Sequence, residues 1–330
     1  MFKITLKNGK FFTCGSNSTI FEAAKSNGIL LEHSCLLARC RSCAVQIEKG
    51  STCDKFDDFV LSSDEKSNNW ILSCNSIPKS DILLNIEDLG NDIFFEKKNV
   101  STKIQSIIQL NENVIEVILR LPPKSNFSYN SGQYVNIFRG KIKRSYSIAN
   151  AYKENTTLNF FIKKYENGLL SNYWFKEAQV NDLLRVEGPM GSFFLRETEM
   201  ENIIFLATGT GVAPIKAIIE NMNESVNKFT NKNLWLFVGA RFEKDLFWDP
   251  KKIISLPNLK YVPVLSRGSE NWKGERGYLQ EIIIKQNIAY ENAQVYACGS
   301  INMIEAAKKK LIEMGLNSKH FFSDAFISTN

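Results

Sequence analysis

The chain has 330 residues, 44% of them hydrophobic and 23% charged, as in ordinary globular proteins, and this length predicts two or three domains. No stretch approaches the roughly 18 uninterrupted apolar residues of a membrane span, and the N-terminus lacks the apolar block of a signal peptide, so we expect a cytoplasmic protein. Only two histidines are present, which argues against chemistry that depends on an imidazole base.

The net charge of +6 is unevenly spread along the chain. Residues 1–90 carry 10 Lys and Arg against 11 Asp and Glu, whereas residues 91–330 carry 31 against 24. A basic second part can attract nucleotide phosphates or an acidic partner, although scattered solvated lysines explain the excess equally well. No block of basic residues indicates binding to nucleic acid.

Residues 1–90 have the pattern of a small β-grasp domain. Two alternating segments surround Asn8-Gly9, a strong hairpin signal. Thr19 and Glu22 have the spacing of a capping box, which predicts a helix that ends at Gly28. The predicted strands are Phe2–Leu6, Lys10–Cys14, Ala44–Ile47 and Ile82–Ile86.

Four of the seven cysteines have the plant-type ferredoxin spacing C-x4-C-x2-C with a distant fourth: Cys35, Cys40, Cys43 and Cys74. Two irons bridged by two sulfides need four thiolates, and one tightly wound loop can supply three. The spacing therefore predicts a [2Fe-2S] cluster. Structural zinc is the alternative, but it usually requires two closely spaced ligand pairs. We interpret Cys14 and Cys53 as ordinary small apolar residues.

This segment resembles the plant-type ferredoxin domains that are fused to ferredoxin-reductase modules. Two positions depart from that family, in which Ala38 is normally Gly and Arg41 is normally a small residue. Small residues there let main-chain N–H groups approach the cluster sulfurs. We expect Ala38 to be a mild change and Arg41 to raise the cluster potential through its positive charge.

A plausible linker over residues 89–99 leads into a β-rich stretch, residues 98–197. Several short strands separated by Gly, Pro and Asn turns predict an antiparallel β-barrel. The predicted strands are Lys103–Leu110, Val114–Leu121, Gln133–Ile137, Ser145–Ala149 and Leu158–Lys164.

Two short motifs in this stretch resemble the flavin domain of the ferredoxin-reductase family: R-x-Y-S at residues 144–147 and G-x-x-S at residues 168–171. The resemblance implies that Arg144 neutralises the FAD pyrophosphate with its fork of donors. It further implies that Tyr146 packs on the isoalloxazine and that the Ser147 hydroxyl lies near flavin N5, which receives hydride.

The second motif contributes Gly168, Leu170 and Ser171 to the expected FAD site, at the start of a helix running to Lys176. The N–H groups of a helix N-terminus suit a pyrophosphate. Lys163 is a further candidate for the diphosphate, and a solvated strand lysine is an equally good interpretation.

Residues 200–330 alternate between strands and helices, which predicts a doubly wound parallel sheet that binds a nucleotide at the carboxyl ends of its strands. Phe321 and Phe322 are interpreted as strand core. The predicted strands are Ile203–Ala207, Leu234–Gly239, Tyr261–Leu265 and Val295–Cys298, and the predicted helices are Ile215–Met222, Leu279–Gln286 and Met303–Met314.

The turn after the first of these strands resembles the G-T-G-x-A-P loop of the ferredoxin-reductase nucleotide domain and contains Gly209, Thr210 and Gly211. Glycines there let the main chain approach a pyrophosphate. Cys298-Gly299 resembles the family's C-G loop, which implies a thiol beside the nicotinamide C4. A buried strand-end cysteine is the alternative.

Three further residues concern the choice of nucleotide. Arg241 lies in a segment resembling the one that flanks the adenosine, and Ser266-Arg267 occupies the place where NADPH-using relatives hold the 2′-phosphate. The overall resemblance favours NADH, and NADPH stays open. Phe326, in a segment resembling the family's terminal one, is expected to cover the flavin face, so we expect Ser147, Cys298 and Phe326 next to the reacting atoms.

Over nearly its whole length the chain resembles iron–sulfur flavoprotein reductases. They pass electrons from NAD(P)H through FAD and a [2Fe-2S] cluster to a partner protein, the hard chemistry being that of the cofactors. The resemblance implies an acceptor protein and no membrane partner, and we expect a monomer when the protein is free. A non-enzymatic interaction protein with structural zinc leaves the flavin and nucleotide motifs unexplained.

Two neighbouring groups share these motifs. The segments Gly188–Arg196 and Phe322–Phe326 look more like CDP-6-deoxy-Δ3,4-glucoseen reductase. That group supplies electrons to a pyridoxamine-phosphate CDP-4-keto-6-deoxyglucose 3-dehydrase in the synthesis of 3,6-dideoxysugars of lipopolysaccharide O-antigen. The alternative is the reductase component of an aromatic or phenol-type oxygenase, and the cofactor motifs do not separate the two.

Overall fold

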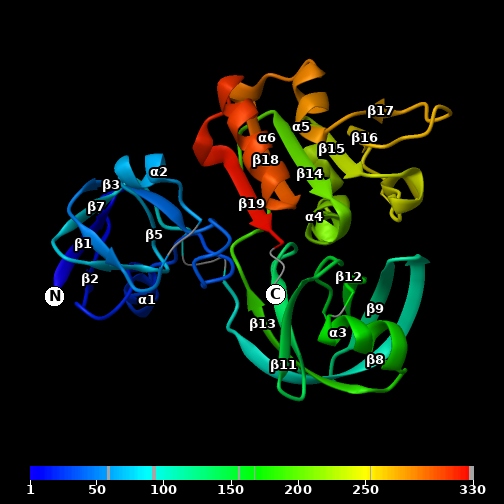
Figure 1. Cartoon of the computed structure of the whole chain (residues 1–330), viewed down its shortest axis with the longest axis horizontal. Coiled ribbons are helices and arrows are strands. Elements are labelled where there is room, and N and C mark those ends of the chain that lie inside the picture. Colours follow the sequence, from blue (N-terminus) through cyan, green and yellow to red (C-terminus); the bar gives the residue numbers. More distant parts are fainter. Residues whose placement is uncertain (58–59, 91–93, 155–156, 167, 253, 327–330) are drawn as a thin grey trace. The chain divides into compact units, whose positions relative to one another are not determined.

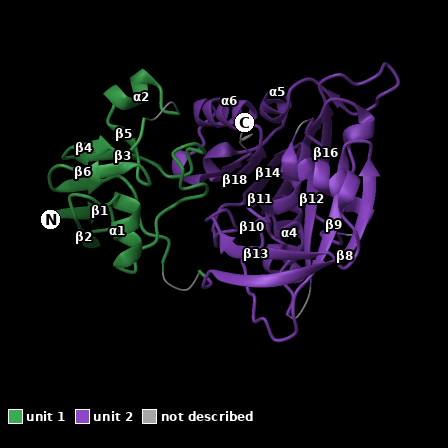
Figure 2. Ribbon diagram, turned by 60° about the horizontal axis from the view of Figure 1, so that its bottom comes forward, with its two compact units in different colours: residues 1–94, 327–330 green, residues 95–326 purple. Residues whose placement is uncertain are grey.

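The computed structural model describes residues 1–330 except 58–59, 91–93, 155–156, 167, 253 and 327–330. The chain divides into two compact units, residues 1–94 and residues 95–326 (Figure 2). Part of the expected linker, residues 91–93, lies outside the described residues. Among the described helices, none has both the length and the apolar character needed to cross a membrane.

The first unit is built on a five-stranded mixed sheet with the order β2-β1-β7-β3-β5 (Figure 1). Strand β1 pairs antiparallel with β2 and parallel with β7. The elements are β1 (Phe2–Leu6), β2 (Phe11–Cys14), α1 (Ile20–Ser26), β3 (Ala44–Lys49), β4 (Thr52–Asp54), α2 (Ser63–Ser67), β5 (Trp70–Leu72), β6 (Ser76–Pro78) and β7 (Ile82–Leu84).

Local signals explain most of this unit. At the start of α1, the Glu22 N–H donates to Thr19 Oγ1 at 3.2 Å and the Thr19 N–H donates to Glu22 Oε2 at 2.9 Å, which completes the capping box. Strand β1 alternates, so Ile4 and Leu6 are buried in one core with the apolar residues of α1. The predicted hairpin, helix and β-grasp fold are confirmed.

The second unit begins with a curled antiparallel sheet in the order β11-β10-β13-β8-β9-β12. Just beyond β11, the Ala149 N–H donates to the Asn159 carbonyl of β12 at 2.8 Å, which brings the two edges of the sheet together. The elements are β8 (Lys98–Asn111), β9 (Val114–Arg120), β10 (Tyr134–Arg139), β11 (Ile142–Ser147), β12 (Thr157–Lys163), α3 (Leu169–Asn172), a π-helical turn (Tyr173–Glu177) and β13 (Leu183–Met190).

The predicted antiparallel barrel is confirmed, but the sequence pattern does not predict β13. This strand pairs with β8 on one side and β10 on the other. It ends in Gly188-Pro189-Met190, and Gly and Pro usually mark turns. Partners on both sides override that local signal, because strand formation depends strongly on tertiary context.

The rest of the second unit is a parallel sheet in the order β17-β16-β15-β14-β18-β19 (Figure 1), and the predicted doubly wound sheet is confirmed. The elements are β14 (Asn202–Thr208), α4 (Val212–Asn223), β15 (Asn233–Ala240), β16 (Leu259–Leu265), β17 (Glu275–Arg276), α5 (Leu279–Ile282), β18 (Ala293–Gly299), α6 (Ile301–Glu313) and β19 (Phe321–Ala325).

The strand order fixes where this sheet can bind a ligand. From β14 the chain adds β15, β16 and β17 on one side, and it then returns to add β18 and β19 on the other. Strands β14 and β18 therefore flank the point where the winding reverses. Ligands of open α/β sheets bind beyond the carboxyl ends of the strands at such a point.

Strand β14 is buried on both faces, as parallel strands covered by helices usually are. Phe205 and Ala207 share a core with the apolar residues of α4. Ile204 and Leu206 pack in a second core with residues of α5 and α6. The two helical layers thus hold β14 and the turn that follows it in a fixed position.

Candidate cofactor sites

The four spaced cysteines lie together in the first unit as two pairs. The Sγ atoms of Cys43 and Cys74 are 3.2 Å apart, and the thiols of Cys35 and Cys40 share a hydrogen bond. A [2Fe-2S] cluster takes two thiolates per iron, so one pair for each iron fits this donor set. A mononuclear zinc site needs three or more ligands around one point, and no such group occurs among the described His, Cys, Asp and Glu residues.

The cluster loop, residues 35–43, turns its N–H groups toward the sulfurs. The Leu37 N–H donates to Cys35 Sγ at 3.3 Å. The hydrogen bond from the Cys40 thiol, aided by main-chain N–H groups and opposed by burial, lowers the pKa of Cys35 to about 6. The main-chain donors favour the thiolate that metal binding requires, whereas the bond between the two thiols raises the pKa of Cys40. Three residues of the loop adopt left-handed backbone: Leu36, Ala38 and Arg41, with φ of 54°, 54° and 63°.

Arg41 of this loop forms an ion pair with a carboxylate. Its guanidinium donates to Glu65 of α2, with Nη1 3.1 Å from Oε2 and Nη2 in contact with Oε1. The expectation that Arg41 simply adds positive charge near the cluster therefore needs correction, because an opposite charge contacts it.

The R-x-Y-S motif lies on β11 and the segment after α3 packs against it. The Trp174 indole N–H donates to the Tyr146 hydroxyl at 3.0 Å, and the two rings meet edge to face. Ser147 is buried at the end of β11, opposite Tyr134 of β10. Arg144 is half-buried, and no carboxylate in the described part of the chain forms an ion pair with it.

The G-x-x-S motif positions its own loop. The Ser171 hydroxyl accepts a hydrogen bond from the Tyr165 N–H at 2.8 Å, and the Leu170 side chain is buried in the barrel core. The side chain of Leu170 is therefore not available to a ligand. Gly168 is half-buried at the start of α3, and Lys163 is exposed, with its Nζ 5.9 Å from the centre of the Tyr165 ring.

The Gly-rich turn after β14 meets the end of β18 at the switch point. The turn is a single 3-10 turn, Gly209–Gly211, that leads directly into α4. A Cβ on Gly211 would lie 2.6 Å from the Cys298 carbonyl carbon. Thr210 is buried and Gly299 has φ of 138°. The two segments expected to hold the nucleotide therefore pack against each other, main chain to main chain.

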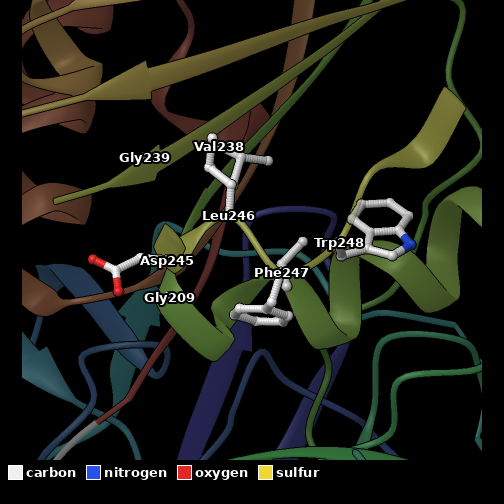
Figure 3. A pocket seen from close by; sticks show the side chains of 8 residues that line it. Gly209, Val238, Gly239, Asp245, Leu246, Phe247 and Trp248 are labelled. Carbon is white, nitrogen blue, oxygen red and sulfur yellow. The ribbon is translucent and has the colours of Figure 1, made fainter. Parts of the chain in front are cut away.

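A pocket lies beside this turn at the carboxyl ends of β14 and β15 (Figure 3). Its polar groups are the Asp245 carboxylate and the main chain of the glycines. Phe247 packs edge to face against Phe161 of the barrel, with ring centres 5.2 Å apart. A carboxylate beside a glycine turn suits a ribose hydroxyl. The lining residues are Gly209, Val212, Val238, Gly239, Asp245, Leu246, Phe247 and Trp248.

Arg241, Ser266 and Arg267 come together at the ends of β15 and β16. The Arg267 N–H donates to the Arg241 carbonyl at 2.9 Å, and the Ser266 N–H donates to the Ala240 carbonyl at 3.0 Å. All three predicted side chains are exposed. Two exposed arginines on adjacent main-chain segments, together with a serine hydroxyl, supply the kind of donors that bind a phosphate group.

Cys298 is fully buried in the core shared with α4. Burial, with a smaller effect of the Asp324 charge, raises the pKa of its thiol, so the thiol is neutral near pH 7. Phe326 follows β19, and its N–H donates to the Gly299 carbonyl at 2.9 Å. The structure therefore places Phe326 directly beside the C-G loop, while Phe321 and Phe322 belong to β19 as predicted.

The motifs did not identify three contributors to these sites. Glu65 pairs with Arg41, and Phe247 and Trp248 line the pocket beside the glycine turn. Asp245-Leu246, next to them in the chain, resembles the adenosine-flanking segment and was the available signal for the pocket. The sequence around Glu65 contains a capping-box spacing with Ser62 but no pattern that predicts a contact with Arg41.

Three family models match the chain in order. They are a 2Fe-2S iron–sulfur cluster binding domain over residues 4–79, an oxidoreductase FAD-binding domain over residues 101–195 and an oxidoreductase NAD-binding domain over residues 205–309. These matches confirm the predicted [2Fe-2S], FAD and nicotinamide cofactors.

Similar proteins match over nearly the whole length. A CDP-6-deoxy-L-threo-D-glycero-4-hexulose-3-dehydrase reductase from Yersinia pestis is 35% identical, covering 97% of this chain and 96% of its own. An anthranilate 1,2-dioxygenase electron transfer component from Acinetobacter baylyi is 28% identical, covering 97% and 94%. The crystal structure of Amycolatopsis cytochrome P450 reductase GcoB matches with a TM-score of 0.74 and 20% identity, covering 99% of each chain, which supports the fold.

The cysteine pairs, the flavin motifs and the glycine turn at the switch point thus occur in one chain, in the same order as in these relatives. A nicotinamide gives up two electrons as hydride, whereas a [2Fe-2S] cluster accepts one, and a flavin links the two kinds of transfer. The chain belongs to the family of NAD(P)H-dependent iron–sulfur flavoprotein reductases, which pass electrons through FAD and a [2Fe-2S] cluster to a partner protein.

Proposed function

We propose that the electron acceptor is a pyridoxamine-phosphate-dependent 3-dehydrase acting on CDP-4-keto-6-deoxyglucose in 3,6-dideoxysugar synthesis. The observation that carries this proposal is the similarity of 35% over nearly both whole chains to a reductase named for such a dehydrase. The dioxygenase component is 28% identical over a similar length, which supports an oxygenase acceptor less well.

The chain's own residues have distinct tasks in this proposal. Arg144, which lacks an ion-pair partner among the described residues, binds the FAD diphosphate, with the start of α3 and Lys163 nearby in the chain. Ser147 presents its hydroxyl to the reacting edge of the flavin, and Tyr146 supports the ring. Phe326 excludes water from the flavin face until nicotinamide takes its place.

For the nucleotide, the main chain of Gly209, Thr210 and Gly211 approaches the pyrophosphate, and the Cys298-Gly299 loop lies beside the nicotinamide. A Cβ on Gly299 would collide with Thr208, so this glycine lets the ends of β18 and β14 pack closely. Arg241, Ser266 and Arg267 surround the adenosine ribose. We propose NADH as the donor, with NADPH as the alternative that the two exposed arginines favour. We also propose domains over residues 1–90, 98–197 and 200–330, a free monomer and a cytoplasmic location.

Reconstitution tests the acceptor. The purified protein is mixed with NADH, a CDP-4-keto-6-deoxyglucose 3-dehydrase and its substrate, and the 3-deoxygenated product is followed by mass spectrometry. We expect product only when the reductase is present. Absence of product, together with rapid turnover when an aromatic oxygenase replaces the dehydrase, would overturn the proposal and favour the oxygenase alternative.

Anaerobic titration identifies the donor. NADH and NADPH are compared by the rate at which each bleaches the flavin absorbance, in the unchanged protein and in Arg267→Ala. We expect NADH to be the better donor in both proteins. If NADPH is better and Arg267→Ala removes that advantage, the arginine pair binds a 2′-phosphate and the protein uses NADPH.

A further inference from the structure

Arg41 is part of the loop that carries three of the four predicted cluster ligands. Arg41 follows Cys40 directly and precedes Cys43 by two residues, so its main chain is part of the cluster loop. Its side chain is only 18% exposed. In a poorly hydrated environment a fixed positive charge favours the reduced cluster, which is one unit more negative than the oxidised one.

The partner of Arg41 is held in place by its own helix. Glu65 Oε2 accepts the Ser62 N–H at 2.9 Å, and the Glu65 N–H donates to Ser62 Oγ at 3.2 Å. This capping box orients the carboxylate without help from Arg41. The guanidinium then fits between that carboxylate and the Val60 carbonyl, which accepts from Nη1 at 2.6 Å. Both ends of the ion pair are therefore fixed.

A pair of opposite charges in contact produces a much weaker field at a distance than either charge alone. We propose that Glu65 is a positioning residue that holds Arg41 against α2 and offsets its charge, and thereby keeps the reduction potential of the cluster lower than it would be without the Glu65 carboxylate. The inference rests on the cluster site and not on the identity of the acceptor.

The pair also has a plain mechanical interpretation, in which it only ties the cluster loop to α2. The two interpretations differ in the sign of their effects. A mechanical tie is lost equally when either partner is removed, so both single variants change the potential in the same direction. A charge-compensating pair gives shifts of opposite sign that cancel when both charges are removed.

The experiment is a redox titration of the full-length protein, followed by the electron spin resonance signal of the cluster. The variants are Glu65→Gln, Arg41→Gln and the two combined, and glutamine at residue 65 preserves the capping box. We expect Glu65→Gln to raise the potential and Arg41→Gln to lower it. Each change should alter the ratio of reduced to oxidised cluster about tenfold at fixed potential, about 59 mV for one electron. The double variant should return close to the starting value.

Asp64→Asn is the matched control, because Asp64 is an exposed carboxylate on the same helix. It should leave the potential almost unchanged. Shifts of the same sign in the two single variants, or an equal shift in Asp64→Asn, would overturn the proposal. If Glu65→Gln fails to retain iron, the proposal is tested by Arg41→Gln alone. A cluster potential in Arg41→Gln that is unchanged or higher than in the unchanged protein would contradict charge compensation. None of these measurements involves an acceptor protein, so failure of the proposed function is detected separately.

Discussion

The cluster loop of the first unit and the nucleotide turn of the second are both short loops that approach a cofactor, but they are built in opposite ways. The cluster loop presents cysteine side chains, and it carries Ala38 and Arg41 at left-handed φ. The nucleotide turn presents main chain, and at Gly211 and Gly299 any side chain would meet neighbouring main chain.

The difference follows from what each cofactor binds. Iron requires thiolates, so the loop needs particular side chains and tolerates a Cβ elsewhere at a modest conformational cost of about 1–2 kcal/mol per residue. A pyrophosphate is bound by N–H groups at close range, and Gly211 has no room for a Cβ because the Cys298 main chain packs against it. Substitutions should therefore be judged by different rules in the two loops.

The largest effect is expected from removing a thiolate. Cys74→Ser should lose the cluster, so that transfer to a one-electron protein acceptor disappears while NADH still bleaches the flavin. Iron content, visible absorbance and acceptor reduction measure this. Cys53→Ser is the control, since Cys53 lies outside the pair arrangement. Retention of full iron by Cys74→Ser would contradict the ligand assignment.

Two glycines of the nucleotide turn test whether crowding or backbone conformation limits substitution there. Gly211→Ala should slow flavin reduction by NADH about 100-fold, because the new Cβ displaces main chain beside Cys298 and a shift of about 1 Å has effects of that size. Gly209→Ala has open space around its Cβ and should retain most of the rate despite φ of 56°. Stopped-flow absorbance measures both. Equal losses would show that backbone conformation, and not crowding, governs the turn.

A buried lysine connects α4, the helix after the nucleotide turn, to the barrel. Lys216 of α4 is buried, donates to the Ala149 carbonyl at 2.8 Å and pairs with Glu220 at 2.6 Å. Lys216→Met should lower the free energy of unfolding by about 3 kcal/mol, because Glu220 loses its cation in a largely buried position.

Lys153 provides the control for this prediction, because it forms an exposed pair with Glu224 at 3.1 Å. Lys153→Met should cost less than about 1 kcal/mol. Chemical denaturation followed by flavin fluorescence and circular dichroism measures both variants. A cost for Lys216→Met no larger than that for Lys153→Met would show that burial does not strengthen the first pair.

The smallest effect is expected at Ala38, which adopts a left-handed backbone with φ of 54°. Ala38→Gly relieves the left-handed backbone but makes the unfolded chain more flexible, and these two effects nearly cancel. We expect the stability in urea to change by less than about 1 kcal/mol and the iron content to stay the same. A gain above about 2 kcal/mol would mean that the Cβ of Ala38 strains the cluster loop, as a Cβ on Gly211 would strain the nucleotide turn.

Features whose parts lie close together in the chain could be predicted from the sequence. The spacing of Cys35, Cys40 and Cys43 predicts the cluster because one loop must surround it. The glycine turn follows β14 directly, and the two residues of the first capping box, Thr19 and Glu22, are three positions apart. Such features are readable because local geometry requires them and because these motifs resemble a known family.

Features whose parts are distant in the chain depend on the packing of the folded protein. Strand β13 forms because β8 and β10 pair with it, despite Gly188-Pro189. Glu65 reaches Arg41 from 24 positions away, and Lys216 reaches Ala149 from 67. No local pattern specifies such partners, because a charged side chain is satisfied either by solvent or by a distant group, and only the packed chain determines which.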